Sequence, residues 1–382
     1  MAGIYIHIPF CKQACTYCNF HFSTSLAQKA AVLEAMNKEI LLTKPFDAGG
    51  GKISTVYFGG GTPSLLSTDE LKNIFEGLHK KFSIDEDAEI TLEANPDDIN
   101  PVVLKQWLEL GINRLSLGVQ SFAEAELVWM NRAHHATESI RSIEQIKDAG
   151  FKNFSVDLIY GSPLLSDDGL KKNLEIIFKA QVPHISCYAL TVETKTALHK
   201  MIDQKKTEPV DPEKQAAQFL LLMDEMKANG YDHYEISNYS LPGMRSKHNS
   251  SYWQGKPYYG FGPSAHSFDG LLNRKWNIAN NALYVRSLQM NEIPFEEETL
   301  TATQRLNEYV MTALRTIEGI DMQLLQTKFG KAHHERIRSI SKKYIDSGKL
   351  TIEKYTGSFA EQLILTREGK LFADGIAADL FF

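Results

Sequence analysis

The chain has 382 residues, 43% of them apolar, which is enough for a full-sized hydrophobic core and a second domain. Its 41 Lys and Arg residues against 47 Asp and Glu residues give a net charge of −6, which excludes a broad electrostatic footprint for nucleic acid. No apolar run reaches membrane-spanning length, and the N-terminus lacks the features of a signal peptide. We therefore expect a cytoplasmic protein with no nucleic-acid partner, for which peripheral contact with a membrane stays open.

The first predicted element is a short strand over residues 3–10, closed by Pro9, that runs directly into a cysteine loop. Cys11, Cys15 and Cys18 place three thiols within eight residues at the C-terminal end of this strand. Thiols gathered so closely predict a metal centre, and the rest of the chain is then the scaffold around it.

Three kinds of site use closely spaced cysteines. A disulfide framework is disfavoured because the chain has only one further cysteine, Cys187, and no signal peptide, a combination typical of a reducing compartment. Structural zinc normally takes two cysteine pairs, or a pair with histidines; His7 and His21 flank the loop, so zinc stays open. An iron–sulfur cluster normally takes four thiolates, so three would leave one iron open to a small molecule.

Strands and helices alternate beyond the loop. Apolar residues at helical spacing predict the helices, and short β-branched apolar runs predict the strands. In chain order we expect a helix over 26–42, a glycine loop at 49–51, a strand over 53–58, a helix from about 69, a strand over 88–93, a helix from 101, a strand over 114–120, a helix over 137–149, a strand over 154–160, a helix over 167–180 and a strand over 185–190.

Repeated βα units with apolar strands predict an α/β fold whose parallel sheet is buried on both faces. With the first strand there are six units, short of the eight in a closed TIM barrel. We expect a partial (β/α)6 barrel over residues 1–200, open on one side for a bulky substrate.

Polar residues recur where the predicted strands end. In such sheets the active site lies at the C-terminal ends of the strands, and Glu93, Gln120 and Asp157 fall there. The segment Gly59–Pro63 follows the second strand, and its glycines permit close backbone approach to a ligand. A single polar residue at the end of a strand is more often only exposed to solvent. Several such residues at the same edge of the sheet, beside a cysteine loop, favour a binding site.

The pattern changes over residues 201–300, which we expect to flank the barrel. A helix is predicted over 213–229 and an edge strand over 233–239. Residues 247–266 are rich in aromatic residues, glycine and histidine with little helical pattern, and are predicted to be a long functional loop. Taken alone, His248 is more simply a histidine of a surface loop.

A small α+β domain is expected over residues 301–382. Helices near 303–316, 321–328 and 331–347 precede a hairpin over 349–355 and 361–366 and a closing helix over 367–377. This order is similar to a winged helix. Its mixed local charge indicates a packing or partner module rather than a DNA reader.

The spacing Cys-x3-Cys-x2-Cys, with Tyr17 before the last cysteine, resembles that of the radical S-adenosylmethionine (SAM) superfamily. In that superfamily three cysteines hold a [4Fe–4S] cluster, and the amino and carboxylate groups of SAM chelate the fourth iron. Further motifs resemble one branch, the oxygen-independent coproporphyrinogen III oxidases and the related haem chaperones. These motifs lie at residues 5–11, 58–63, 117–122 and 156–161.

The resemblance implies roles for individual residues. Cys11, Cys15 and Cys18 would hold the cluster. Positions that match cofactor contacts of the family are Tyr5, Tyr17, Gly60, Gly61, Thr62, Glu93, Gln120, Arg132 and Asp157. Physically, Arg132 suits the SAM carboxylate, and a carboxylate side chain suits its amine or ribose hydroxyls.

Two departures separate this chain from the oxidases. Their motif continues to a fourth cysteine, where this chain has Phe20, and they carry a long N-terminal extension that is missing before the strand at residue 3. Residues 248–253, His-Asn-Ser-Ser-Tyr-Trp, also resemble the haem-binding motif of the chaperones. The resemblance therefore implies that His248 contacts haem.

The first hypothesis is a haem chaperone, without catalytic residues, that passes haem to haem-requiring proteins. Membrane-associated respiratory enzymes are expected among the receivers, and the cluster and SAM would support transfer or a homodimer. The second hypothesis is an enzyme that decarboxylates the propionates of coproporphyrinogen III by radical chemistry. A radical SAM enzyme acting on another substrate stays open, because substrate choice lies in loops rather than in the barrel.

Overall fold

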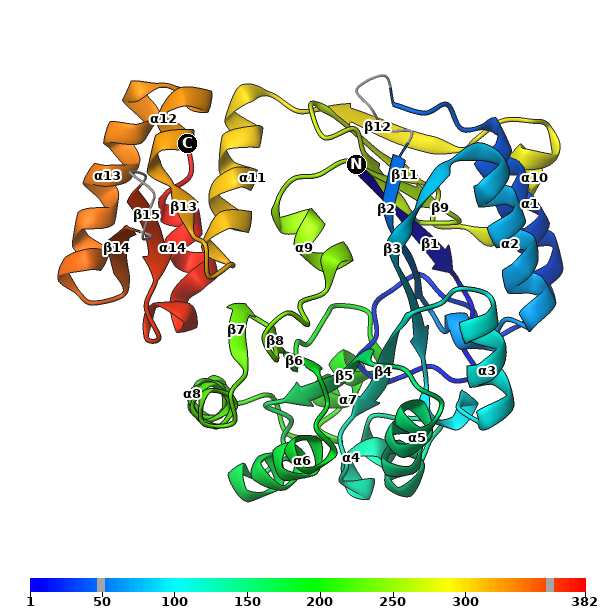
Figure 1. Cartoon of the computed structure of the whole chain (residues 1–382). Coiled ribbons are helices and arrows are strands. Elements are labelled where there is room, and N and C mark those ends of the chain that lie inside the picture. The colour runs from blue at the N-terminus through cyan, green and yellow to red at the C-terminus, as the bar shows by residue number, and fades with distance from the viewer. Residues whose placement is uncertain (47–51, 355–360) are drawn as a thin grey trace. The chain divides into compact units, whose positions relative to one another are not determined.

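The computed structural model describes residues 1–46, 52–354 and 361–382, so the expected glycine loop at 49–51 lies outside the described residues. The chain forms two compact units (Figure 1). The first comprises residues 1–218 and 256–298, and the second comprises residues 219–255 and 299–382. The units are interleaved along the sequence, and the three consecutive segments expected above stay a prediction.

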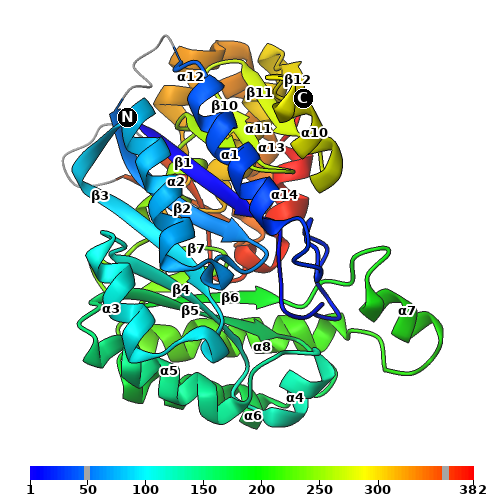
Figure 2. The ribbon, with the colours of Figure 1, turned by 90° about the vertical axis from the view of Figure 1, so that its right-hand side faces the viewer.

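The first unit is built on six parallel strands that neighbour one another in chain order, which confirms the partial barrel. The strands are β1 (Ala2–Ile8), β2 (Lys52–Gly60), β3 (Ser83–Ala94), β4 (Arg114–Gln120), β5 (Asn153–Tyr160) and β6 (His184–Ala189). Figures 1 and 2 show helices along the outer side of this sheet. The helices of the unit are α1 (Lys29–Leu42), α2 (Thr68–Lys81), α3 (Pro101–Glu109), α4 (Glu124–Trp129), α5 (Ala136–Asp148), α6 (Asp167–Ala180), α7 (Ala197–Asp203) and α10 (Asn281–Gln289).

The two faces of the sheet differ in chemistry. Alternate residues of β1, including Ile4 and Ile6, are fully buried apolar side chains on one face. The register of β1 with β2 and of β2 with β3 puts Tyr5, Tyr57 and Thr91 on the other face. Both faces are buried, as expected for a parallel sheet, but one is apolar and the other carries polar side chains.

The segment 247–266, predicted to be a loop, contains regular structure instead. Residues Lys247–Trp253 form helix α9, which begins where the Ser246 hydroxyl accepts a hydrogen bond from the Asn249 amide. Strand β9 (Tyr258–Phe261) pairs in parallel with β1. Both elements are too short to show a period in sequence, which explains the wrong prediction.

The sheet continues beyond β9 with three strands that sequence analysis did not predict. They are β10 (His266–Phe268), β11 (Asn273–Asn277) and β12 (Phe295–Thr299). The buried carboxylate of Glu39 in α1 ties this extension to the barrel. It accepts hydrogen bonds from the backbone N–H of Gly262 (2.9 Å), the side-chain Nδ2 of Asn277 (2.6 Å) and the hydroxyl of Tyr284 (2.5 Å).

The second unit contains α8 (Pro212–Ala228), which spans the boundary at residue 218, and a C-terminal α+β module. The module has α11 (Ala302–Leu314), β13 (Ile320–Asp321), α12 (Met322–Phe329), α13 (Lys331–Asp346), β14 (Leu350–Lys354), β15 (Glu361–Leu365) and α14 (Ala373–Asp379). Its three strands lie in the order β13-β15-β14, so the predicted helices and hairpin are confirmed. Among the described residues, no helix is both long and apolar enough to cross a bilayer.

Two local predictions in the second unit were wrong. The edge strand expected over 233–239 is an antiparallel pair, β7 (Asp232–Glu235) and β8 (Asn238–Ser240), joined by a tight turn. The closing helix expected from 367 starts as a short 3₁₀ turn, Gly369–Phe372, and becomes α-helical only at Ala373. The Gly369 amide donates to the Thr366 hydroxyl, which fixes this turn.

Candidate cluster and cofactor site

The cysteine loop is held over the C-terminal end of β1 by backbone hydrogen bonds. The Cys11 amide donates to the carbonyl of Ser23 (3.0 Å), and the Thr16 amide donates to that of Met130 (3.0 Å). The Thr16 carbonyl accepts from the Leu198 amide (2.7 Å). All three cysteines of the loop are free and partly exposed. The loop is therefore fixed while its thiols stay accessible.

Arg132 connects this loop to two other parts of the site. Its Nη1 lies 3.2 Å from Cys15 Sγ, and its Nη2 donates to the Asn95 side chain and the Gly118 carbonyl, each at 2.7 Å. Its Nε is buried and has no partner. One N–H of a buried cation is thus left to pair with a group from outside the protein, as an acceptor such as a carboxylate would.

Burial and hydrogen bonding act in opposite directions on the pKa of the Cys11 thiol. Burial raises the pKa of Cys11 to about 11, and a hydrogen bond from Thr62 opposes that rise. Burial also raises the pKa of Cys18. Tyr17, directly before Cys18, packs against the apolar cluster of Met130, Ile159, Leu190 and Leu198. This aromatic residue anchors the end of the loop.

The glycine segment after β2 is pressed against the cysteine loop. The Gly61 amide donates to the Ile8 carbonyl (2.8 Å) and the Thr62 amide to the Phe10 carbonyl (2.7 Å). A Cβ on Gly61 would lie 2.5 Å from the Phe10 carbonyl oxygen, closer than any real contact. These two amides are used within the protein, so the contribution of Gly61 that the structure supports is close packing.

Gly60 has a different constraint. Its φ is +105°, a conformation that favours glycine. A Cβ there would lie 2.5 Å from the His7 Nδ1. Both positions therefore need glycine for steric reasons.

Buried carboxylates lie on the polar face of the sheet. Glu93 accepts from the Tyr57 hydroxyl at 2.8 Å, and Asp157 accepts from the Ser116 hydroxyl at 3.2 Å. Burial raises the pKa of Glu93 to about 7 and that of Asp157 to about 6. Tyr5 lies on the same face, with its hydroxyl 3.2 Å from His7 Nδ1.

Gln120 ends β4 in a left-handed conformation with φ 68°. The space beside Gly118 is bordered by the side chains of Gln120, Arg132 and Asn95, all within 3.4 Å of a Cβ built there. Gly118 therefore allows these three polar side chains to converge at the end of β4.

His248 belongs to the second unit, whereas the residues just described belong to the first. It is 1% exposed, and its Nε2 lies 2.8 Å from the Tyr252 hydroxyl, one turn along α9. The expected surface-loop histidine is thus a buried residue on a helix.

Several residues of the site were missed in the sequence. They are Tyr57, Asn95, Ser116, Ser155 and Ser186, which contact the predicted residues or lie on the same face. The signal was the alternation within each strand, where every second residue from Thr91 to Glu93 or from Ser155 to Asp157 is polar.

The donor set fits an iron–sulfur cluster better than zinc. Both ring nitrogens of His7 are engaged, with Tyr5 and with the His21 carbonyl, and His21 Nε2 lies 2.8 Å from Asn281 Oδ1. In the described ranges no three His, Cys, Asp or Glu side chains converge on one metal ion. A cluster does not need such convergence, because each thiolate binds its own iron. Three accessible thiols beside the partnerless Arg132 Nε are consistent with a cluster and an acidic ligand.

Comparison with known proteins decides the family. The profile of the Radical SAM superfamily matches residues 5–177, and that of the HemN C-terminal domain matches residues 300–372. The protein named "Heme chaperone HemW" of Bacillus subtilis (strain 168) is 30% identical over 379 residues, 98% of each chain. The chain belongs to the HemW family. Another HemW, from Mycobacterium tuberculosis (strain ATCC 25618 / H37Rv), is 33% identical over 99% of this chain and 94% of its own.

A solved structure confirms the fold of this HemW family member. Coproporphyrinogen III oxidase (HemN) from Escherichia coli superposes with a TM-score of 0.84, covering 100% of this chain and 90% of the oxidase, at 20% identity. At that identity the likeness shows the fold alone. The family profiles and the HemW relatives confirm the expected branch of the radical SAM superfamily.

Proposed function

We propose that this protein binds haem and passes it to haem-requiring proteins. The observation that carries the proposal is similarity over almost the whole chain to proteins named heme chaperone HemW. Phe20, 66% exposed where the oxidases have a fourth cysteine, supports the same choice. Haem is the cargo in this account, and the expected receivers include membrane-associated respiratory enzymes.

Cys11, Cys15 and Cys18 would hold a [4Fe–4S] cluster, and SAM would bind beside it. Such a cluster, when bound, supplies an iron open to SAM and a source of single electrons. Arg132 is suited to the SAM carboxylate through its partnerless Nε. We assign the remaining SAM contacts to Tyr5, Tyr17, Gly60, Gly61, Thr62, Glu93, Gln120 and Asp157 as a proposal. We further propose that this site supports transfer, or a homodimer, rather than catalysis.

His248 is proposed as a haem contact on the basis of its motif. In the structure it is buried and bonded to Tyr252. Contact with haem therefore requires the His248 imidazole to exchange this partner and leave its site. Replacing Tyr252 by phenylalanine removes the competing hydroxyl, so Y252F should bind haem at least as well as wild type.

The test is a haemin titration of the purified full chain, followed in the Soret region. Wild type is expected to give a saturable band and to transfer the haem to a haem-free acceptor protein. H248A is expected to bind more weakly, and H334A serves as a control on a partly exposed histidine of the same unit. Binding of haemin by H248A as tight as by wild type would remove His248 from the account.

The oxidase is the second candidate, supported by fold relation to HemN. Anaerobic protein with reductant, SAM and coproporphyrinogen III would then give protoporphyrinogen. We expect no product, because the fourth cysteine position holds Phe20. Formation of protoporphyrinogen at a steady turnover would favour the enzyme.

A further inference from the structure

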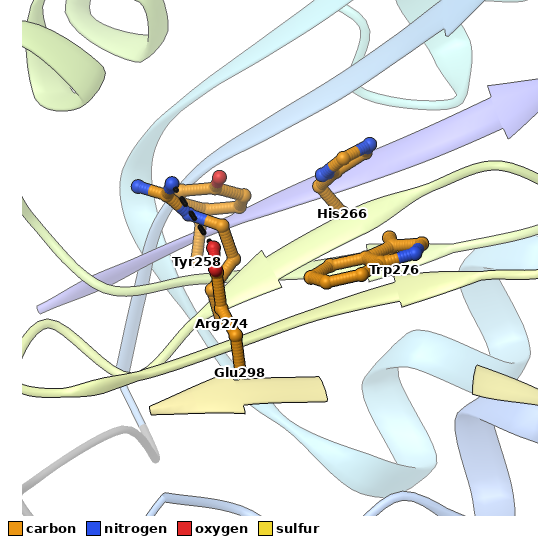
Figure 3. Close-up of a pocket in the computed structure, with 5 residues that line it drawn as sticks. All are labelled: Tyr258, His266, Arg274, Trp276 and Glu298. Carbon is orange, nitrogen blue, oxygen red and sulfur yellow. Dashed lines mark ion pairs between the residues drawn. The ribbon is translucent and has the colours of Figure 1, made fainter. Parts of the chain in front are cut away.

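A pocket of about 390 Å³ lies on the strand extension of the first unit, away from the cysteine loop in sequence. It is lined by Tyr258, His266, Arg274, Trp276 and Glu298, which come from β9, β10, β11 and β12 (Figure 3). None of these five is among the predicted site residues or in the family motifs quoted above, although Tyr258 and His266 fall in the segment 247–266 that was predicted to be functional.

The pocket faces the same side of the sheet as the candidate SAM contacts. Tyr5 is paired with Gly260 in parallel, and Phe268 with Tyr258 in antiparallel register. Paired residues of neighbouring strands point to the same face, so His266, two residues before Phe268, shares the face of Tyr5. A Cβ on Gly260 would lie 2.0 Å from the His266 carbonyl oxygen, so glycine at 260 allows the main chain at His266 to pack directly against β9.

His266 has the properties of a haem ligand. Its side chain is exposed, and in the part of the chain that the structure describes its ring makes no hydrogen bond. It stacks on Trp276, with ring centroids 6.1 Å apart and planes at 28°. The indole N–H of Trp276 lies 3.2 Å from Glu296 Oε2, which holds that ring in place. His266 is therefore oriented without using its nitrogens.

Arg274 supplies a cation in the lining of the same pocket. It lies two residues from Trp276 on β11 and therefore on the same face, paired across strands with Phe268. Its guanidinium lies over the Phe268 ring, 5.7 Å from the ring centroid. Its Nη1 also lies 3.6 Å from Glu298 Oε1 (Figure 3). An ion pair between partly exposed side chains is weak, so a propionate can replace Glu298 at small cost.

We propose that this pocket receives the edge of haem, with His266 binding the iron and Arg274 pairing with a propionate. The inference rests on the proposed function of haem binding. Strand side chains stand roughly perpendicular to the sheet, so a porphyrin bound through His266 lies across the face. The pocket holds one edge of the ring. The haem contact proposed for His248 needs that buried side chain to leave its site, whereas His266 is already exposed.

The first experiment compares haemin binding and coordination in the full chain and its variants. H266A should bind haemin about tenfold more weakly than wild type and lose the spectral signature of histidine-ligated ferric haem. Added imidazole should restore that signature in H266A, and H266Y should give the spectrum of tyrosinate-ligated iron. H79A, which changes an exposed histidine on α2, is the matched control and should behave as wild type.

The second experiment tests Arg274 through the ligand. R274Q should weaken haemin binding about three- to tenfold and leave binding of the haemin dimethyl ester, which lacks propionate charge, unchanged. Equal losses for both ligands would contradict the propionate contact.

The outcomes separate this inference from the proposed function. Wild type that binds no haemin would overturn both. Wild type that binds haemin while H266A keeps the same affinity and spectrum would overturn only the assignment of His266, and a loss confined to H248A would place the ligand there instead. Unchanged far-ultraviolet circular dichroism in H266A shows that any loss arises at the site.

Discussion

Arg132 is the residue on which the geometry of the candidate cluster site depends most. It joins Cys15, Asn95 and Gly118 and keeps one N–H for a further partner. A planar guanidinium can hold these directions at once, whereas an ammonium is a point charge. Arg132 was predicted from the resemblance, but its contact with Asn95 follows only from the fold, because 37 residues separate them.

We predict that R132K keeps the positive charge and loses the planar set of N–H donors that contacts Cys15, Asn95 and Gly118. Leaving the Gly118 carbonyl or the Asn95 oxygen without its donor costs about 1–3 kcal/mol, and SAM affinity should fall about tenfold. Isothermal titration with SAM after anaerobic reconstitution measures the change, with R141K on the exposed side of α5 as control. Equal SAM affinity in R132K and wild type would count against a role for Arg132 at the carboxylate.

Glu39 gives a pH-dependent prediction. Burial raises its pKa from 4.5 to about 7, against hydrogen bonds from Tyr284, Gly262 and Asn277. Because the pKa is raised in the folded state, its stabilising contribution is complete below pH 4.5 and is lost as pH rises through about 7. Tyr284, the one titratable group that bonds it, has a raised pKa and stays protonated in this window.

Between pH 4.5 and about pH 7, the free energy of unfolding of wild type should therefore fall by about 3 kcal/mol relative to that of E39Q. Urea unfolding of both proteins at several pH values measures the difference. The comparison cancels other groups that titrate in the same window. A difference that does not change with pH would show that the carboxyl group titrates normally.

At the scale of elements, the βα rhythm was sufficient to predict the six parallel strands of the barrel. The apolar pattern of β1 to β6 and the intervening helices carries that information locally. Strands β9 to β12 were not predicted, because each has only three to five residues, and β9 joins the sheet by pairing with β1, far away in sequence. Helix α9 was missed for the same reason, since its seven residues are rich in polar and aromatic side chains.

The glycine segment shows how an element depends on single positions. G60A places a Cβ against His7 in a backbone conformation of positive φ. G111A creates the same kind of conformational strain, φ +88°, with nothing within 4 Å of the Cβ. G60A should therefore be less stable than G111A by about 1–3 kcal/mol, and the cysteine loop should reconstitute less iron.

Urea unfolding and iron content of the two variants provide the measurement. Equal stabilities would mean that the contact between Gly60 and His7 is relieved without cost. That result would also remove the steric reason for glycine at this position.

At the scale of the whole molecule, two independent observations identify the protein family. Fold and motif place the chain among radical SAM proteins, and similarity over its whole length places it in the HemW family. The sequence was sufficient for both, because the cysteine spacing and the strand-end motifs are local. The pocket at His266 was not predictable, since its residues are brought together only when β9 to β12 pair.

The most direct test of the account is haem transfer by the anaerobically reconstituted full chain. The protein is loaded with haemin, freed of excess, and mixed with a haem-free acceptor whose Soret band differs. The account predicts that the acceptor gains haem faster from the loaded protein than from a haemin–albumin control. It also predicts that coproporphyrinogen III with SAM and reductant stays unconverted. No haem binding together with conversion of coproporphyrinogen III would contradict the account.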